Sequence, residues 1–99
     1  MTVETTRWDA AEHLDSPEAI AAYVDAAMED GDPALVSAVL GDVARAMGMT
    51  QIAKDTGMSR ESLYRALSAE GHPEFATVAK VMKALGLRLS AIPASRGAS

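Results

Sequence analysis

The stretch that decides the fold runs from Thr50 to Leu67 and reads TQIAKDTGMSRESLYRAL. Gly57 can take the left-handed backbone conformation that ends a helix, and Ser59 is a residue type that caps the start of the next one. Leu63 and Leu67 stand four residues apart, so they fall on one face of that second helix. The stretch therefore predicts two short helices joined by a tight turn.

The spacing inside this stretch is typical of a DNA-binding helix-turn-helix. A small residue, Ala53, is followed by Gly57 four residues later and by the apolar Leu63 six residues after that. The small side chain lets two helix backbones approach closely, and the apolar one anchors the second helix. We expect helices over 50–56 and 60–69, with the second helix polar enough to lie against DNA.

The chain of 99 residues is long enough for one domain with a single modest core. Hydrophobic residues make up 48% of it, alanine is abundant and β-branched residues are scattered, which favours helices over sheets. We expect an all-α fold of about five helices plus a short C-terminal strand. The expected parts are an N-terminal arm at 1–14, an acidic two-helix half at 16–48, the helix-turn-helix and a following helix at 49–86, the strand at 87–93 and a disordered tail at 94–99.

Two helix starts stand out in the first half. Ser16-Pro17 and Asp32-Pro33 each pair a capping residue with a proline, which fits the first position of a helix. Apolar residues at helical spacing follow both starts, and a glycine ends each run. Gly41, inside the second run, costs a helix roughly 1 kcal/mol relative to alanine, so we expect a close helix crossing there.

The C-terminal part carries one more helix and a weak strand pattern. Apolar residues at helical spacing from Phe75 to Leu85 predict the helix. The run Leu87–Ile92 then alternates apolar and polar side chains until Pro93, as half-exposed strands do. A single strand has no partner within the chain, so we expect it to pair with a second copy or with a partner's sheet edge.

Charge is divided unevenly along the chain, whose net charge is −5. Residues 1–48 carry ten acidic and two basic side chains, whereas residues 49–99 carry four acidic and seven basic ones. Salt screens charges beyond a Debye length of about 8–10 Å, so the local field of the second half governs its attraction to phosphate. The overall acidity does not exclude DNA binding there, and the acidic first half suits a basic protein partner.

Several function classes are disfavoured by what the sequence lacks. It has no cysteine, which excludes disulfides and thiolate metal sites. It shows no basic, apolar leader and no apolar run approaching about 18 residues, which favours a cytoplasmic protein without a membrane segment. His13 and His72 stand in separate segments, and no HExxH, GxSxG or P-loop motif occurs. We therefore expect no catalysis, no cofactor and no metal.

The helix that begins at Arg60 carries the side chains able to read bases. Arg60 or Arg65 can donate a bidentate pair to guanine O6 and N7, and Glu61 can accept from a cytosine amine, each good pair discriminating by about 1–3 kcal/mol. Which arginine reads a base stays open, as does the alternative that Glu61 pairs with Arg65 and that Tyr64 belongs to the core edge. Serine, glutamine and lysine side chains suit phosphate oxygens. The predicted DNA-contacting set is Gln51, Lys54, Ser59, Arg60, Glu61, Ser62, Tyr64 and Arg65.

Several longer blocks carry a family resemblance. They are RWDAAE at 7–12, LDSPEAI at 14–20, EDGDPAL at 29–35, MTQIA at 49–53, SRESLY at 59–64 and FATV at 75–78, continuing to LGL at 85–87. Through these blocks the chain resembles the addiction-module antidote proteins, HigA-like antitoxins whose lambda-repressor-like helix-turn-helix is of the XRE (phage repressor and Cro) type. The resemblance implies a type II antitoxin that neutralises a RelE/HigB-like toxin and, as a homodimer on operator DNA, represses their shared promoter.

The resemblance also assigns roles within the motif, with one departure. Thr50-Gln51 stands closer to Ala53 than in many XRE proteins, so the family's phosphate-clamping glutamine does not map plainly onto Gln51. The positions that match the base-reading residues of phage-type repressors are Ser59, Arg60, Glu61 and Arg65.

The first half is where the resemblance implies toxin binding. RelE-like toxins are expected to be basic because they act on ribosome-bound RNA, and an acidic surface would speed association with them. We expect Arg7, Trp8 and Leu14 to contact the toxin; the alternative for Trp8 is that it folds back onto its own core. Two other functions stay open: a stand-alone transcriptional or prophage repressor without a toxin, and a protein-interaction module that has lost DNA binding.

Overall fold

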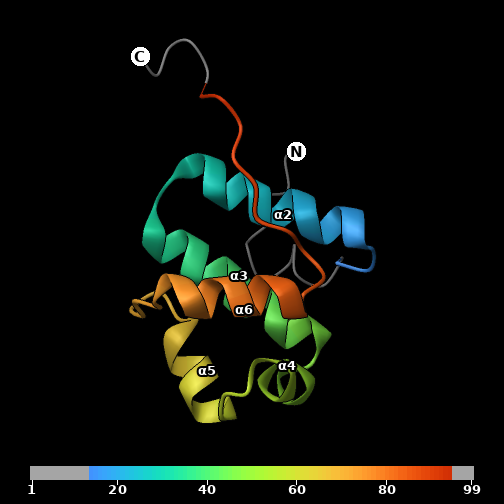
Figure 1. Cartoon of the computed structure of the whole chain (residues 1–99), viewed down its shortest axis with the longest axis vertical. Helices are drawn as coiled ribbons and strands as arrows, with labels where there is room; N and C mark the ends of the chain where they lie inside the picture. The colour runs from blue at the N-terminus through green and yellow to red at the C-terminus, as the bar shows by residue number, and fades with distance from the viewer. Residues whose placement is uncertain (1–13, 95–99) are drawn as a thin grey trace, which may run out of the picture.

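The computed structural model describes residues 14–94, and within them the chain forms five α-helices and no strand (Figure 1). The expected all-helical fold class is confirmed. In Figure 1, α2 lies at one end of the molecule and α4 and α5 lie at the other, with α3 and α6 between them. The helices are α2 (Pro17–Asp30), α3 (Pro33–Met47), α4 (Met49–Thr56), α5 (Arg60–Ala66) and α6 (Phe75–Ala84).

Three of these helices begin at a side-chain cap, as the sequence predicts. The Ser16 hydroxyl accepts a hydrogen bond from the Ala19 amide at 3.1 Å, and the Asp32 carboxylate accepts one from the Ala34 amide at 3.0 Å. The Ser59 hydroxyl likewise accepts from the backbone of the first turn of α5. Each cap satisfies an amide that has no partner within its helix. These local bonds explain why the predicted helix starts are confirmed.

The end of α5 differs from the predicted helix over 60–69, because α5 stops at Ala66. Leu67 leaves the helical conformation, with φ −101° and ψ 40°. The Ser68 hydroxyl donates to the Arg65 carbonyl at 3.1 Å, which gives that carbonyl a partner other than the next helical turn. The chain then folds back so tightly that a Cβ at Gly71 would come within 3.0 Å of the Ala66 carbonyl oxygen.

The expected close crossing at Gly41 is confirmed. A Cβ built at this position would fall within 3.0 Å of the carbonyl oxygen of Leu67. The backbone of α3 therefore passes directly against the end of α5, at a spacing that only glycine permits. This contact fixes α5 relative to the middle of the fold.

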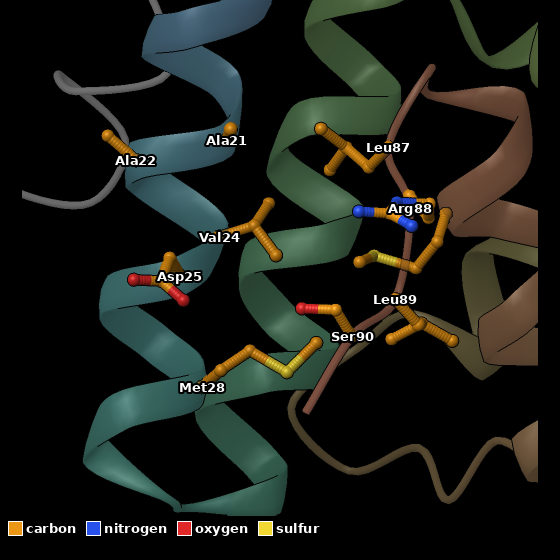
Figure 2. A pocket seen from close by; sticks show the side chains of 10 residues that line it. Ala21, Ala22, Val24, Asp25, Met28, Leu87, Arg88, Leu89 and Ser90 are labelled. Atoms are coloured by element: carbon orange, nitrogen blue, oxygen red, sulfur yellow. The ribbon is translucent and has the colours of Figure 1, made fainter. Parts of the chain in front are cut away.

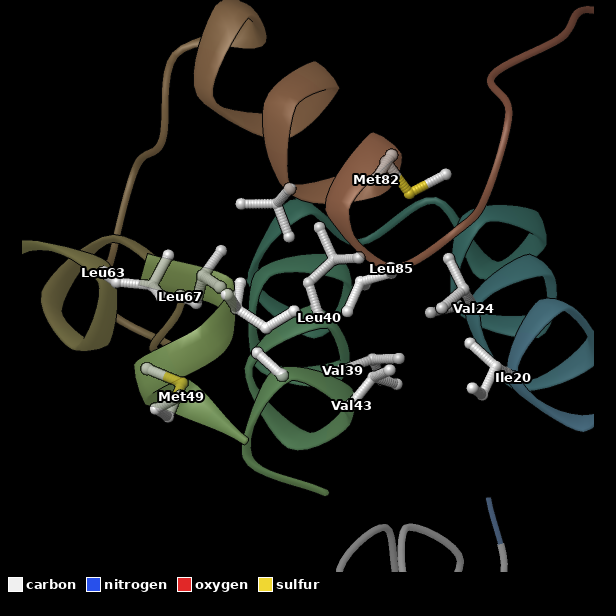
Figure 3. Close-up of a cluster of buried hydrophobic side chains, with 14 of the residues drawn as sticks. Ile20, Val24, Val39, Leu40, Val43, Met49, Leu63, Leu67, Met82 and Leu85 are labelled. Atoms are coloured by element: carbon white, nitrogen blue, oxygen red, sulfur yellow. The ribbon is translucent and has the colours of Figure 1, made fainter. Parts of the chain in front are cut away.

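The helices share one hydrophobic core, built around α3 (Figure 3). Leu40 and Val43 of α3 are fully buried, as are Leu63 of α5 and Val81 of α6. Every helix contributes, so removing any one of them would expose apolar surface. The buried residues of the core are Ile20, Val24, Ala27, Val39, Leu40, Val43, Ala44, Met49, Ile52, Ala53, Leu63, Leu67, Val81, Met82 and Leu85.

The expected strand at 87–93 is wrong for this chain on its own. The segment is extended but forms no strand pairing within residues 14–94, and it runs from the end of α6 past α2 (Figure 1). Its one backbone bond to the helices comes at its start, where the Leu87 amide donates to the Met82 carbonyl at 2.8 Å. An alternating pattern makes a strand only when a second strand supplies the ladder, and residues 14–94 contain no such strand.

Candidate nucleic-acid interface

The candidate interface is built on α4 and α5 and the turn between them. Gly57 takes φ 75° and ends α4, and the Met58 amide donates back to the Ala53 carbonyl at 3.1 Å. Thr56 is buried, and its hydroxyl donates to the Ile52 carbonyl at 2.9 Å. These bonds fix the end of α4 and the direction in which the chain turns toward α5.

The structure brings all eight predicted DNA-contacting residues together on this unit. Seven are exposed and Ser62 is half-buried, because the apolar positions between them, such as Ile52 and Leu63, turn inward. Their contact with DNA stays a prediction. The residues are Gln51 and Lys54 on α4, Ser59 at the cap, and Arg60, Glu61, Ser62, Tyr64 and Arg65 on α5.

Two of these side chains form hydrogen bonds within the chain. The Gln51 amide group donates to the Asp55 carboxylate at 2.8 Å, one helical turn along α4. The Ser59 hydroxyl accepts from the Ser62 amide at 3.0 Å, yet it keeps its own hydrogen to donate. A phosphate contact by Gln51 would have to compete with Asp55, whereas one by Ser59 would leave its cap in place.

The alternative pairing of Glu61 with Arg65 does not occur among the described residues. Their spacing allows an ion pair, but the ion pair found in this region joins Arg45 to Asp42 instead. Glu61 and Arg65 are both exposed. Both charges therefore face solvent from α5, where an outside partner can reach them.

Two arginine side chains contact the aromatic ring of Tyr64. The Arg60 guanidinium carbon lies 5.9 Å from the ring centroid, and that of Arg45 lies 6.0 Å from it. Both distances are within the range of a cation–π interaction. Tyr64 is 39% exposed, and its ring contacts one arginine of α3 and one of α5.

Arg45 is the residue of this site that the sequence reasoning missed. It belongs to the acidic first half and stands 19 residues before Tyr64 in the chain, so the spacing within the motif gave no reason to place it beside Tyr64. The one available signal was its rarity, since Arg7 and Arg45 are the only arginine or lysine residues among the first 48. Arg45 donates to the carboxylate of buried Asp42 at 3.0 Å, which orients its side chain.

Charge follows the same division in space as in sequence. Within residues 49–94 there are six basic and four acidic side chains, whereas residues 14–48 hold one basic and seven acidic ones. The first group includes α4 and α5, and the second makes up α2 and α3. The two parts α2 and α4–α5 stand at opposite ends of the molecule, although Arg88 of the first group lies beside α2 (Figure 1). The end that carries α4 and α5 is thus the one suited to a polyanion.

A groove of about 430 Å³ lies at the other end, between α2 and the segment after α6 (Figure 2). Val24 and Met28 line it from α2, and Leu87 and Leu89 line it from the segment. No group of three or more metal-ligating side chains occurs in residues 14–94. The same stretch contains no helix with the length and apolar character needed to cross a membrane.

The predicted toxin-contacting residues are only partly within the structure. Arg7 and Trp8 lie outside the described residues. Leu14 is half-buried and packs against the core of its own chain. Toxin contact by these residues stays a prediction.

The fold and the site define a class first: a small all-helical protein that presents one short, charged helix to solvent. Comparison with known proteins gives the family. Residues 4–93 match the family of probable addiction module antidote proteins, and the chain belongs to that family. A Haemophilus influenzae protein described as uncharacterized is 51% identical over 88 residues, which cover 89% of this chain and 91% of that protein. No solved structure matches the chain.

Membership of this family of probable antidotes is consistent with the expected antitoxin. An antidote implies a toxin partner, and it indicates a regulatory rather than an enzymatic role. The finer assignments to the HigA-like group and to XRE-type DNA binding stay predictions.

Proposed function

We propose that this chain is the antitoxin of a type II toxin–antitoxin module. It binds and neutralises a RelE/HigB-like toxin in the cytoplasm, and it represses its own operon by binding operator DNA through α4 and α5 as an XRE-type helix-turn-helix. The observation that carries the DNA-binding part is the exposed face of α5, where Arg60, Glu61 and Arg65 face solvent beside a packed and capped turn. The family supports the antidote part.

The size of α5 makes a homodimer part of the proposal. A helix of seven residues is only about 10 Å long and reaches a few base pairs. Two copies would read half-sites about one DNA turn, ~34 Å, apart. Occupancy of an operator that overlaps the promoter would then block transcription.

The α2 end of the molecule supports the toxin-binding part. Exposed acids such as Asp25 and Glu29 stand there. Asp25 itself lines the groove, together with apolar residues such as Val24 and Leu89 and one cation, Arg88. An acidic surface next to an apolar groove suits a basic protein partner, because charge steers the encounter and apolar contact holds it. The two functions then use opposite ends of one molecule.

DNA binding is tested with the promoter fragment upstream of this chain's own gene. We expect Arg65→Ala to weaken binding in a gel-shift or fluorescence titration, because a charged side chain that would face the major groove of DNA is lost. The fold and any toxin complex should be unaffected, since Arg65 is exposed. Arg88→Ala, which removes an exposed arginine from the segment beside α2, serves as the matched control. Equal affinity of Arg65→Ala and the unchanged chain would remove Arg65 from the site.

Toxin neutralisation is tested by co-expression with the product of the small reading frame next to the gene, with a tag on this chain alone. A stable complex that also restores growth supports the antitoxin. Recovery of this chain alone, still shifting its promoter fragment, supports the stand-alone repressor instead. A shift that is absent or insensitive to salt supports the interaction module, because phosphate contacts make affinity fall steeply with salt.

A further inference from the structure

A row of polar and aromatic side chains runs from α2 through α3 to α5. The Tyr23 hydroxyl of α2 donates to one oxygen of the Asp42 carboxylate at 3.2 Å, and Arg45 donates to the other at 3.0 Å. Arg45 lies 6.0 Å from the ring centroid of Tyr64, and Arg60 lies 5.9 Å from the same centroid. The row therefore ends at the first residue of the helix that faces solvent.

The inner end of the row is fixed by burial. Asp42 is 2% exposed, and a buried carboxylate is stable only when it is paired and hydrogen-bonded. Tyr23 and Arg45 supply those bonds from two different helices. The bond to Asp42 keeps the Arg45 guanidinium beside the ring of Tyr64.

The outer end of the row explains how Arg60 can be held where it stands. Arg60 is the first residue of α5, where the positive end of the helix dipole disfavours a cation. The ring of Tyr64, one turn further along, offers the negative face of an aromatic ring to that cation. This contact restrains an arginine whose side chain would otherwise sample many rotamers.

We propose that Tyr64 is a positioning residue whose ring holds Arg60 ready to read a base, and that Arg45, anchored on Asp42, holds that ring in place. The proposal rests on the proposed DNA-binding function and deepens it: it assigns base reading to Arg60 and gives Tyr64 a role other than contact with DNA. An arginine ordered before binding loses less entropy when it forms a bidentate pair with guanine. The acidic half thus contributes to specificity without touching DNA.

Tyr64→Leu is the first test, because Tyr64 is partly exposed and its removal leaves no buried charge unpaired. We expect the affinity of this variant for the promoter fragment to fall about 2- to 5-fold, which corresponds to the free energy of a solvent-exposed cation–π interaction. In an Arg60→Gln background the same substitution should cost nothing further. Paired with Arg65→Ala, which lies outside the row, it should act additively.

Two more variants separate positioning from direct contact. Tyr64→Phe keeps the ring and should keep the affinity, whereas a hydroxyl that binds phosphate would be lost in it. Arg45→Gln should lower affinity only while Tyr64 is present, with thermal unfolding of each variant reported beside it because Asp42 loses a partner. Loss of affinity in Tyr64→Phe, or additivity of Tyr64→Leu with Arg60→Gln, would overturn the proposal.

A measurement on the free protein distinguishes this failure from failure of the proposed function. The side-chain protons of Arg60 should show an upfield ring-current shift in the NMR spectrum, which disappears in Tyr64→Leu. Absence of that shift overturns the row whatever the chain binds. If the shift is present and the unchanged chain does not bind its promoter fragment, both DNA binding and the role of the row in it are wrong.

Discussion

Gly41 lets the backbone of α3 pass close to the end of α5 because it has no Cβ. Replacing a helical glycine by alanine ordinarily stabilises a helix by roughly 1 kcal/mol, but here the new Cβ would meet the carbonyl oxygen of Leu67. Forcing apart closely packed backbones costs about 1–3 kcal/mol, so we expect Gly41→Ala to lower the free energy of unfolding. Urea denaturation followed by circular dichroism measures it. A raised midpoint would mean that the crossing is looser than the structure shows.

Predictions about single residues were confirmed where the cause lies in neighbouring residues of the chain, or where an unfavourable residue in a helix indicates a packing constraint. Ser16 and Ser59 are caps because their neighbours three residues on need an acceptor. The close crossing at Gly41 was predictable because a glycine destabilises a helix interior, so its presence there indicates that a side chain would not fit. Arg45 beside Tyr64 was not predictable, since their contact depends on how α3 and α5 cross. That crossing is a property of tertiary packing rather than of spacing.

At the scale of an element, α5 depends on its cap more than the longer helices do. It has seven residues, too few for a helix to be stable by itself in water. We expect Ser59→Ala to cost about 1 kcal/mol of stability and to weaken promoter binding, because the first turn carries Arg60 and Glu61. Thermal unfolding and titration of the promoter fragment measure the two effects.

Ser90→Ala provides the matched control for this cap, since Ser90 is an exposed serine on the segment after α6, beside α2. It should change neither the melting temperature nor DNA affinity. If Ser59→Ala loses affinity without any loss of stability, the Ser59 hydroxyl contacts DNA directly and the cap is secondary.

The boundaries of the helices show which parts of the fold could be predicted from the sequence and which could not. The starts of α2, α3 and α5 follow from capping residues. The end of α5 came earlier than predicted because Ser68 bonds the Arg65 carbonyl and the chain turns back over it. The strand expected at 87–93 is not seen in the single chain, because alternation describes only one of the two strands that a ladder needs.

At the scale of the whole molecule, charge and function divide along the same axis. The acidic end offers Asp25 and Glu29 on α2, and the other end offers α4 and α5 (Figure 1). Charges this far apart are screened from one another at physiological salt. One end can therefore attract a polyanion while the other attracts a basic protein, and removing exposed charges at one end should leave binding at the other intact.

This separation yields a prediction for the toxin complex. Removing two of the four acidic charges of α2 with Asp25→Asn and Glu29→Gln should slow toxin association by less than about tenfold at low salt, because exposed charges act on the encounter more than on the bound state. Dissociation and promoter binding should not change, and the effect should fade as salt is raised. Glu70→Gln, an exposed acid between α5 and α6, is the control, and stopped-flow fluorescence is the measurement. If neither the α2 variant nor the control changes the association rate, the toxin does not approach α2. The remaining role of the acidic half would then be to anchor Arg45.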